Sequence, residues 1–278
     1  MRALTRSPRG PEEFAWDPAR GVLAPGALED VDAVVHLAGE PIGVRWTRAR
    51  QDVIRSSRVE GTCLLAARLA ALERPPRVLV AVSATGWYGN RGDEIVDERS
   101  APGAGFLAAL CRDWEDAASA AARAGVRVVH PRLGLVLAAR GGTLARMLPV
   151  FRLGLGGPLG NGRAWWSWVH LDDVIAVVLR ALEDERIAGA VNVVAPAPVR
   201  NRDFARALGR ALRRPAALPA PAFALRVVFG EMADEALLTS VRVDPARLCA
   251  LGHAFRFAEL DEALRAILRP RSGGDRAA

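Results

Sequence analysis

Short apolar runs alternate with longer amphipathic stretches along most of this sequence, and no other feature constrains the fold as strongly. Residues 31–37 (VDAVVHL), 78–82 and 126–130 are almost continuously apolar, as the buried strands of a parallel sheet tend to be. The stretches between them are long enough to be crossover helices. The pattern therefore predicts an α/β fold, a doubly wound parallel sheet with helices on both faces.

Two crossover helices are predicted from the spacing of apolar residues. Residues 47–72 carry apolar side chains at helical spacing, and Pro75-Pro76 prevents continuation. Residues 105–124 show the same spacing, and Gly125 ends that segment.

Past Pro196 the alternation weakens into helical pieces between prolines. We therefore expect a Rossmann-like domain over residues 1–195, a smaller and mostly helical subdomain over 196–268, and a disordered tail over 269–278. The predicted helices of the subdomain are residues 201–212, 221–229, 245–251 and 259–268.

Composition excludes several classes of protein. No apolar run approaches the roughly 18 residues that span a bilayer, and the first residues lack the apolar stretch of a secretory signal. A cytoplasmic protein without a membrane partner is expected. The three cysteines, Cys63, Cys111 and Cys249, are far apart and have no metal-binding spacing, so no metal site is predicted.

The basic character of the chain does not by itself indicate nucleic-acid binding. The formal net charge is +7 and all 38 basic residues are arginines, but these are scattered among acidic residues along helical stretches, which is typical of solvated helix faces. We expect a small-molecule substrate and no nucleic-acid partner, and the oligomeric state is left open.

Five segments in order resemble one family, the epimerase family proteins of the extended short-chain dehydrogenase/reductase superfamily, which are similar to NAD-dependent epimerases and dehydratases and carry a C-terminal domain of unknown function. The likeness covers nearly the whole chain. The segments are HLAGEPIGVRWT (36–47), SRVEGT (57–62), VSATGWYG (82–89) with GFLAALCRDWEDAA (105–118), GGPLGNGRAWWSWVHLDD (156–173) and PAFALRVVFGEMADEALLTSVRVDPARL (221–248).

The resemblance implies a Rossmann fold that opens with a strand, a glycine loop and a helix, whose N-terminal amides receive the cofactor pyrophosphate. The beginning RALTRSP instead resembles the second strand. We therefore expect the sheet to lack its first strand and glycine loop. Either the start codon was assigned too late and roughly 30 more residues precede it, or the chain is truly truncated and a partner or a swapped strand fills the gap.

The same resemblance implies a cofactor-binding set. Thr5 and Arg6 would face the adenosine ribose, and the planar guanidinium of Arg6 would pair with a 2′-phosphate, which favours NADP over NAD. The alternative for Arg6 is a solvent-facing residue in a turn beside Pro8. Leu37, Ala38 and Gly39, at the end of the strand that begins at Val31, would lie close to the cofactor phosphates. Arg58 would either contact a phosphate or be an ordinary exposed arginine of a helix. This set is Thr5, Arg6, Leu37, Ala38, Gly39, Arg58 and Ser83.

The catalytic Tyr-x-x-x-Lys pair of related dehydrogenases is absent, because the corresponding helix reads FLAALC and the sequence has no lysine. Tyr88, the one tyrosine, resembles a residue that borders the substrate cleft in related epimerases. It either donates a proton to the substrate, with Arg132 or Arg163 as the nearby cation, or has a packing or binding role. Ser83 and Thr85 either orient the substrate or satisfy backbone groups at the strand end.

Two aromatic features have open interpretations. His170 either takes part in catalysis or is a hydrogen-bonded structural residue, beside a helix expected to be capped by Asp172 or Asp173. Trp165, Trp166 and Trp168 form either an aromatic wall of a substrate site or part of the core.

Two functions are compatible with these observations. The first is an NADP-dependent oxidoreductase or epimerase-like enzyme with an unusual proton donor. Its substrate is unidentified, and nucleotide-linked molecules are among the candidates. The second is a cofactor-binding regulator without turnover, because some members of the family carry names linked to cell or plastid division.

Overall fold

A parallel sheet forms the centre of the molecule, so the predicted α/β fold is confirmed. The computed structural model describes residues 1–269, and the 270–278 part of the predicted disordered tail lies outside the described residues. The sheet has the order β12 (Gly189–Val193), β8 (Arg127–Leu133), β5 (Val78–Ala81) and β4 (Ala33–His36), and β6 (Ser83–Ala84) adds to β8. Every pair is parallel.

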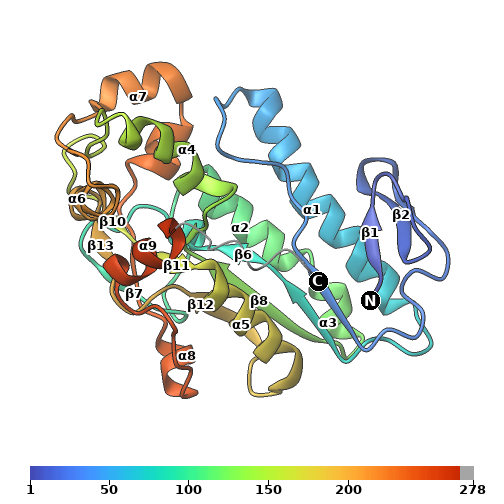
Figure 1. The fold of residues 1–278 in the computed structure, drawn as a ribbon. Coiled ribbons are helices and arrows are strands. Elements are labelled where there is room, and N and C mark those ends of the chain that lie inside the picture. Colours follow the sequence, from blue (N-terminus) through green and yellow to red (C-terminus); the bar gives the residue numbers. More distant parts are fainter. Residues whose placement is uncertain (270–278) are drawn as a thin grey trace.

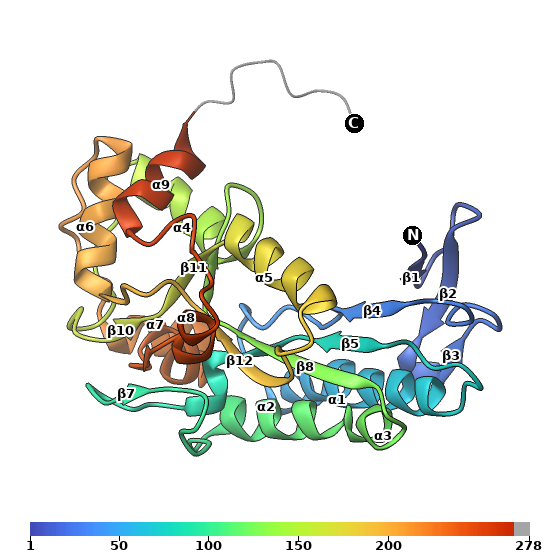
Figure 2. The ribbon, with the colours of Figure 1, turned by 90° about the horizontal axis from the view of Figure 1, so that it is seen from below.

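Helices cover both faces of this sheet (Figure 1, Figure 2). On one face lie α1 (Arg48–Ala70), α2 (Phe106–Asp116) and α3 (Ser119–Arg123), and on the other lies α5 (Leu171–Glu183). Helix α1 was predicted, and it begins where the side chain of Thr47 accepts a hydrogen bond from the amide of Arg50. The single helix predicted over 105–124 was wrong, because the chain turns after Asp116 and forms α2 and α3 separately.

The first residues form a small separate sheet beside the main one. It contains β1 (Ala3–Thr5), β2 (Glu13–Asp17) and β3 (Val22–Leu23), with β1 parallel to β2. Strand β4 pairs with β5 on one side, and within residues 1–269 no strand pairs with its other edge. Val35 in this edge strand is 39% exposed.

Helices pack together at the end of the sheet farther from β1 (Figure 1). They include α4 (Gly142–Arg152), α6 (Asn201–Leu212), α7 (Ala222–Phe229), α8 (Ala246–Ala250) and α9 (Leu260–Leu268), together with a π-helix, Ala233–Leu237. Leu148, Phe204 and Leu264 belong to one buried cluster that joins α4, α6 and α9. Among the described residues no helix is long and apolar enough to cross a membrane.

Three short strand pairs connect this helical region to the sheet. They are β9 (Leu135–Leu137) with β11 (Trp168–His170), β10 (Trp165–Trp166) with β13 (Val199–Arg200), and β7 (Ile95–Val96) with β14 (Arg242–Val243). The four helices predicted past Pro196 are present within a residue of their expected bounds. These pairs position the helical region over the carboxyl ends of the central strands.

Candidate functional site

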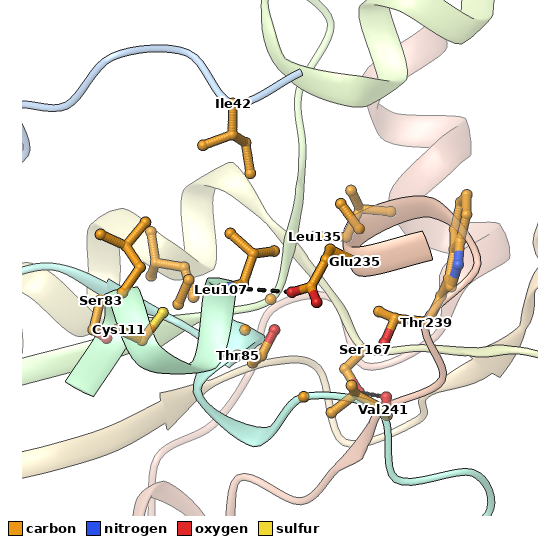
Figure 3. Close-up of a pocket in the computed structure, with 18 of the residues that line it drawn as sticks. Ile42, Ser83, Thr85, Leu107, Cys111, Leu135, Ser167, Glu235, Thr239 and Val241 are labelled. Carbon is orange, nitrogen blue, oxygen red and sulfur yellow. Dashed lines mark hydrogen bonds between the residues drawn. The ribbon is translucent and has the colours of Figure 1, made fainter. Parts of the chain in front are cut away.

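A cavity of about 630 Å³ lies at the carboxyl ends of β6 and β8, beneath the helical region (Figure 3). Ligands of open α/β sheets commonly bind at this end of the strands. Ser83, Thr85 and Leu37 are in its wall, as are residues from α2 and from the segment after α7. Three of the predicted site residues are thus brought together from two strand ends.

A second cavity, of about 470 Å³, lies where β1 and the segment after β4 approach each other. Thr5, Arg6, Ala38 and Gly39 are all in its wall. The side chain of Arg6 is 78% exposed, and its nearest acidic partner, Glu40, is 4.0 Å away. The guanidinium of Arg6 is therefore free to turn toward an anion in this cavity.

Arg58 lies between the two cavities. A Cβ added to Gly39 would lie 3.0 Å from the guanidinium carbon of Arg58, so glycine allows the backbone to pass close to this side chain. Arg58 donates to the carbonyl oxygen of Glu40 at 3.0 Å and its guanidinium carbon is 5.1 Å from the ring centre of Trp114. Burial lowers the pKa of Arg58. Arg58 also lines the larger cavity.

The hydroxyl of Ser83 is held by a buried ion pair. It donates to Glu115 Oε1 at 2.7 Å, and Glu115 pairs with Arg132 through contacts of 2.8 and 2.9 Å. Ser83 and Arg132 are 1% and 3% exposed. Because the proton of Ser83 is committed to Glu115, its oxygen can only accept further hydrogen bonds. Thr85 is half-buried in the cavity wall.

The same ion pair extends to Tyr88, behind the cavity. Tyr88 is fully buried and in the wall of neither described cavity. Its hydroxyl donates to Asn192 Oδ1 at 2.6 Å and accepts from Arg132 at 3.2 Å. Burial raises the pKa of Tyr88. Of the two cations suggested for Tyr88, Arg132 is thus its neighbour, and the contacts are those of a structural hydroxyl.

His170 also lies outside both cavities and is a helix cap. Its Nδ1 accepts from the amide of Asp172 at 3.0 Å, so the expectation that Asp172 or Asp173 would cap α5 was wrong. Asp173 instead accepts the backbone amides of Arg256 and Phe257. Burial lowers the pKa of His170, which keeps the ring neutral and able to accept this hydrogen bond at neutral pH.

The face of α2 that lines the larger cavity is apolar where related dehydrogenases place tyrosine and lysine. Leu107 and Cys111, one turn apart, both lie in the wall. Burial raises the pKa of the Cys111 thiol to about 12, so it is protonated and a poor nucleophile. Trp165 and Trp166 are in the wall, whereas Trp168 is fully buried.

Glu235 is a cavity residue that the sequence analysis did not identify. It lies in the π-helix and its Oε2 accepts the amide of Leu107 at 3.0 Å. A π-helical turn is frequent at functional sites, but its sequence, ADEAL, reads as an ordinary polar helix. Within residues 1–269, no three His, Cys, Asp or Glu side chains gather in a way that could hold a metal ion.

The sheet topology, with cavities at the carboxyl ends of parallel strands, defines a Rossmann-like α/β class of protein. The model of the NAD dependent epimerase/dehydratase family matches residues 23–194, and a domain of unknown function, DUF1731, matches residues 220–267. The chain belongs to the epimerase family proteins that combine these two parts.

The similar proteins include a crystallised relative. The chain is 42% identical to the epimerase family protein ML0860 of Mycobacterium leprae, over 97% of this chain and 88% of that protein. The structure of human epimerase family protein SDR39U1 (isoform 2) with NADPH has a TM-score of 0.87 and 35% identity, covering 96% of this chain and 90% of the human one. A UDP-glucuronic acid 4-epimerase from Bacillus cereus, with a TM-score of 0.70 and 18% identity, shares the fold.

Proposed function

We propose that this protein binds NADP across the two cavities and acts as an oxidoreductase or epimerase-like enzyme on a small substrate in the larger one. The observation that carries the proposal is the placement of the two cavities on either side of the segment from Leu37 to Glu40. One cavity offers an exposed arginine and the other offers hydroxyl groups. The crystallised human relative contained NADPH.

The residues fit the two ends of such a cofactor. Arg6, with Thr5 beside it, suits a 2′-phosphate because a guanidinium pairs with phosphate through two parallel donors. Gly39 lets the backbone approach a phosphate, and Arg58 lies next to it. NADP, when bound, supplies hydride transfer, while Ser83 and Thr85 orient the substrate oxygen.

Titration of NADPH and NADH into the protein tests the role of Arg6. We expect NADPH to bind more tightly, and Arg6→Ser to weaken NADPH roughly tenfold to a hundredfold, the worth of one hydrogen-bonded charge, while leaving NADH unchanged. Arg9→Ser is the matched control, since Arg9 is an exposed arginine in the same loop and outside the cavity wall. Equal affinities for the two cofactors would show that Arg6 selects nothing.

The open edge of β4 suits one further strand with a glycine loop. Val35 and Leu37 are exposed along this edge, and α5 presents an exposed apolar stripe of Leu171, Ile175 and Leu179. A strand there would pair the free backbone groups of β4, and a following helix would cover the stripe and supply amides for the pyrophosphate. The mass of the protein isolated from its natural source tests this, because an upstream unit adds roughly 30 residues.

A second candidate is a cofactor-binding regulator without turnover, and the apolar face of α2 supports it. Leu107 and Cys111 cannot take the acid–base roles of tyrosine and lysine. The two candidates separate when the protein is given NADPH with a panel of carbonyl metabolites, and NADP with a panel of alcohols and amines. Oxidation or reduction of the cofactor supports the enzyme, and tight cofactor binding without either supports the regulator.

A further inference from the structure

The carboxylate of Glu235 points into the larger cavity from the C-terminal part of the chain (Figure 3). In the figure it lies between Leu107 and Thr85, with one oxygen toward the amide of Leu107. That oxygen, Oε2, accepts the Leu107 amide at 3.0 Å. The described residues offer no hydrogen-bond partner to Oε1. One oxygen of the carboxylate is thus anchored and the other remains available to a ligand.

The backbone around Glu235 fixes the carboxylate in this position. Gly105, the residue that precedes α2, has a φ of +101° and no side chain, and a Cβ at this residue would lie 2.1 Å from Glu235 Oε1. The carboxylate also lies at the N-terminus of α2, where the free amides of the first turn favour a negative charge. Gly105 and α2 together hold a negative charge at the wall of the cavity.

The other charged groups of the wall do not neutralise Glu235. The charged wall residues are Arg58, Asp234 and Glu235. Asp234 is paired with Arg226 through contacts of 2.9 and 3.0 Å. Arg58 lies at the end of the cavity toward Gly39, where it donates to backbone oxygens of Glu40 and Ile54. The end of the cavity beside α2 and the π-helix therefore carries a negative charge that no cationic side chain of the wall pairs with.

The uncharged wall residues are mostly apolar. Leu107 and Leu135 lie beside the carboxylate, and Val241 lies farther along the wall near Ser167 (Figure 3). Ser83, whose proton is given to Glu115, presents an acceptor and not a donor. A ligand that meets Glu235 at this end of the wall needs an apolar body and a hydrogen-bond donor, while the hydroxyls of Thr85 and Thr239 can either donate or accept.

We propose that the larger cavity selects substrates whose reacting end is an alcohol or amine on an apolar body, and that Glu235 is the residue that recognises the donor and excludes anions. The proposal rests on the proposed function, because it describes the substrate of the same cavity. A carboxylate or phosphate at this end would face Glu235 at close range in a partly desolvated site, where like charges repel strongly. An anionic part of a larger substrate would have to lie outside this end.

Three probes of one shape test the proposal: cyclohexylamine, cyclohexanol and cyclohexanecarboxylate. Their affinities are measured by ligand-observed NMR on the full chain at neutral pH, without cofactor. We expect the amine to bind at least as tightly as the alcohol and the carboxylate to bind about tenfold more weakly than the alcohol, a modest share of the repulsion between close charges. The net charge of +7 would favour the carboxylate non-specifically, so it works against the expected order.

Glu235→Gln is the test variant, because glutamine keeps an oxygen for the Leu107 amide and removes the charge. This variant should bring the affinity for cyclohexanecarboxylate within about threefold of the affinity for cyclohexanol, and it should lower the affinity for cyclohexylamine. Glu231→Gln is the matched control, since Glu231 is an exposed carboxylate two residues before the π-helix that contacts Gln51. This control should keep the wild-type order.

Three outcomes would overturn the proposal: equal binding of the three probes, an unchanged order in Glu235→Gln, or no binding of any probe. NADPH is titrated into the same samples. A chain that binds the probes in the expected order but not NADPH contradicts the proposed function alone, and a chain that binds NADPH but shows no order contradicts only the present inference.

Discussion

Removal of the Glu115 carboxylate is expected to destabilise the protein more than any exposed ion pair would. The Glu115 and Arg132 side chains are 9% and 4% exposed, and Arg132 lies between Glu115 and Tyr88 with its guanidinium carbon 3.8 Å from the ring centre of Trp87. Glu115→Ala leaves the Arg132 charge buried without a partner. Breaking a buried pair in this way costs about 3 to 5 kcal/mol.

Urea unfolding of the wild type and variants measures this cost. We expect Glu115→Ala to lower the free energy of unfolding by about 3 to 5 kcal/mol and the double variant Glu115→Leu/Arg132→Met to recover most of the loss, because it removes both charges. Asp203→Asn is the control, since Asp203 and Arg206 form an exposed pair with 47% and 67% exposure worth less than about 1 kcal/mol. A loss below 1 kcal/mol for Glu115→Ala, or a double variant as unstable as the single one, would refute the reasoning.

Two further expectations concern titration and cysteine reactivity. Burial lowers the pKa of His36 from 6.5 to about 4. Between these pH values the unfolded chain therefore binds a proton that the folded chain does not. The contribution of His36 to the free energy of unfolding is fully present above pH 6.5 and falls as the pH drops to 4, by about 3 kcal/mol at 1.36 kcal/mol per pKa unit. Urea unfolding against pH should show this difference between wild type and His36→Gln, and parallel curves would contradict it. Iodoacetamide should modify the exposed Cys63 in the native protein and should leave Cys111 unmodified until the protein unfolds, because Cys111 is buried and its pKa is raised to about 12. Peptide mass spectrometry measures the labelling of each cysteine. Early labelling of Cys111 would show that the cavity wall opens.

The elements that could be predicted from sequence are those whose causes are local. Helix α1 follows from its apolar spacing and from the Thr47 cap, and β5 follows from four consecutive apolar residues. The break between α2 and α3 has no local signal, because residues 116–122 are mostly alanine, a strong helix former. The turn instead lets Ala118 and Ala121 pack in the buried cluster that contains Leu65 of α1.

The site residues divide in the same way. Thr5 ends β1, and Arg6, Ala38 and Gly39 follow strand ends; the family resemblance assigned them to one cofactor site, and they line one cavity. Tyr88 looked available for chemistry because its partner is distant in sequence: Asn192 is 104 residues away. His170 looked available although its partner, the amide of Asp172, is only two residues away. Only the packed fold shows that Tyr88 is buried.

Glu235 shows why the C-terminal part of the chain matters for the chemistry of the larger cavity. Its contact with Leu107 spans 128 residues, and it reaches the N-terminus of the helix on which related dehydrogenases carry tyrosine and lysine. The Rossmann part offers Ser83, an acceptor, and an apolar helix face at this place. The ionisable group that meets a substrate there comes from the segment matched by DUF1731. Substrate selection in this family member therefore depends on the two parts together, and a Rossmann part alone would keep the cofactor-side residues Thr5, Arg6 and Gly39 while losing the carboxylate.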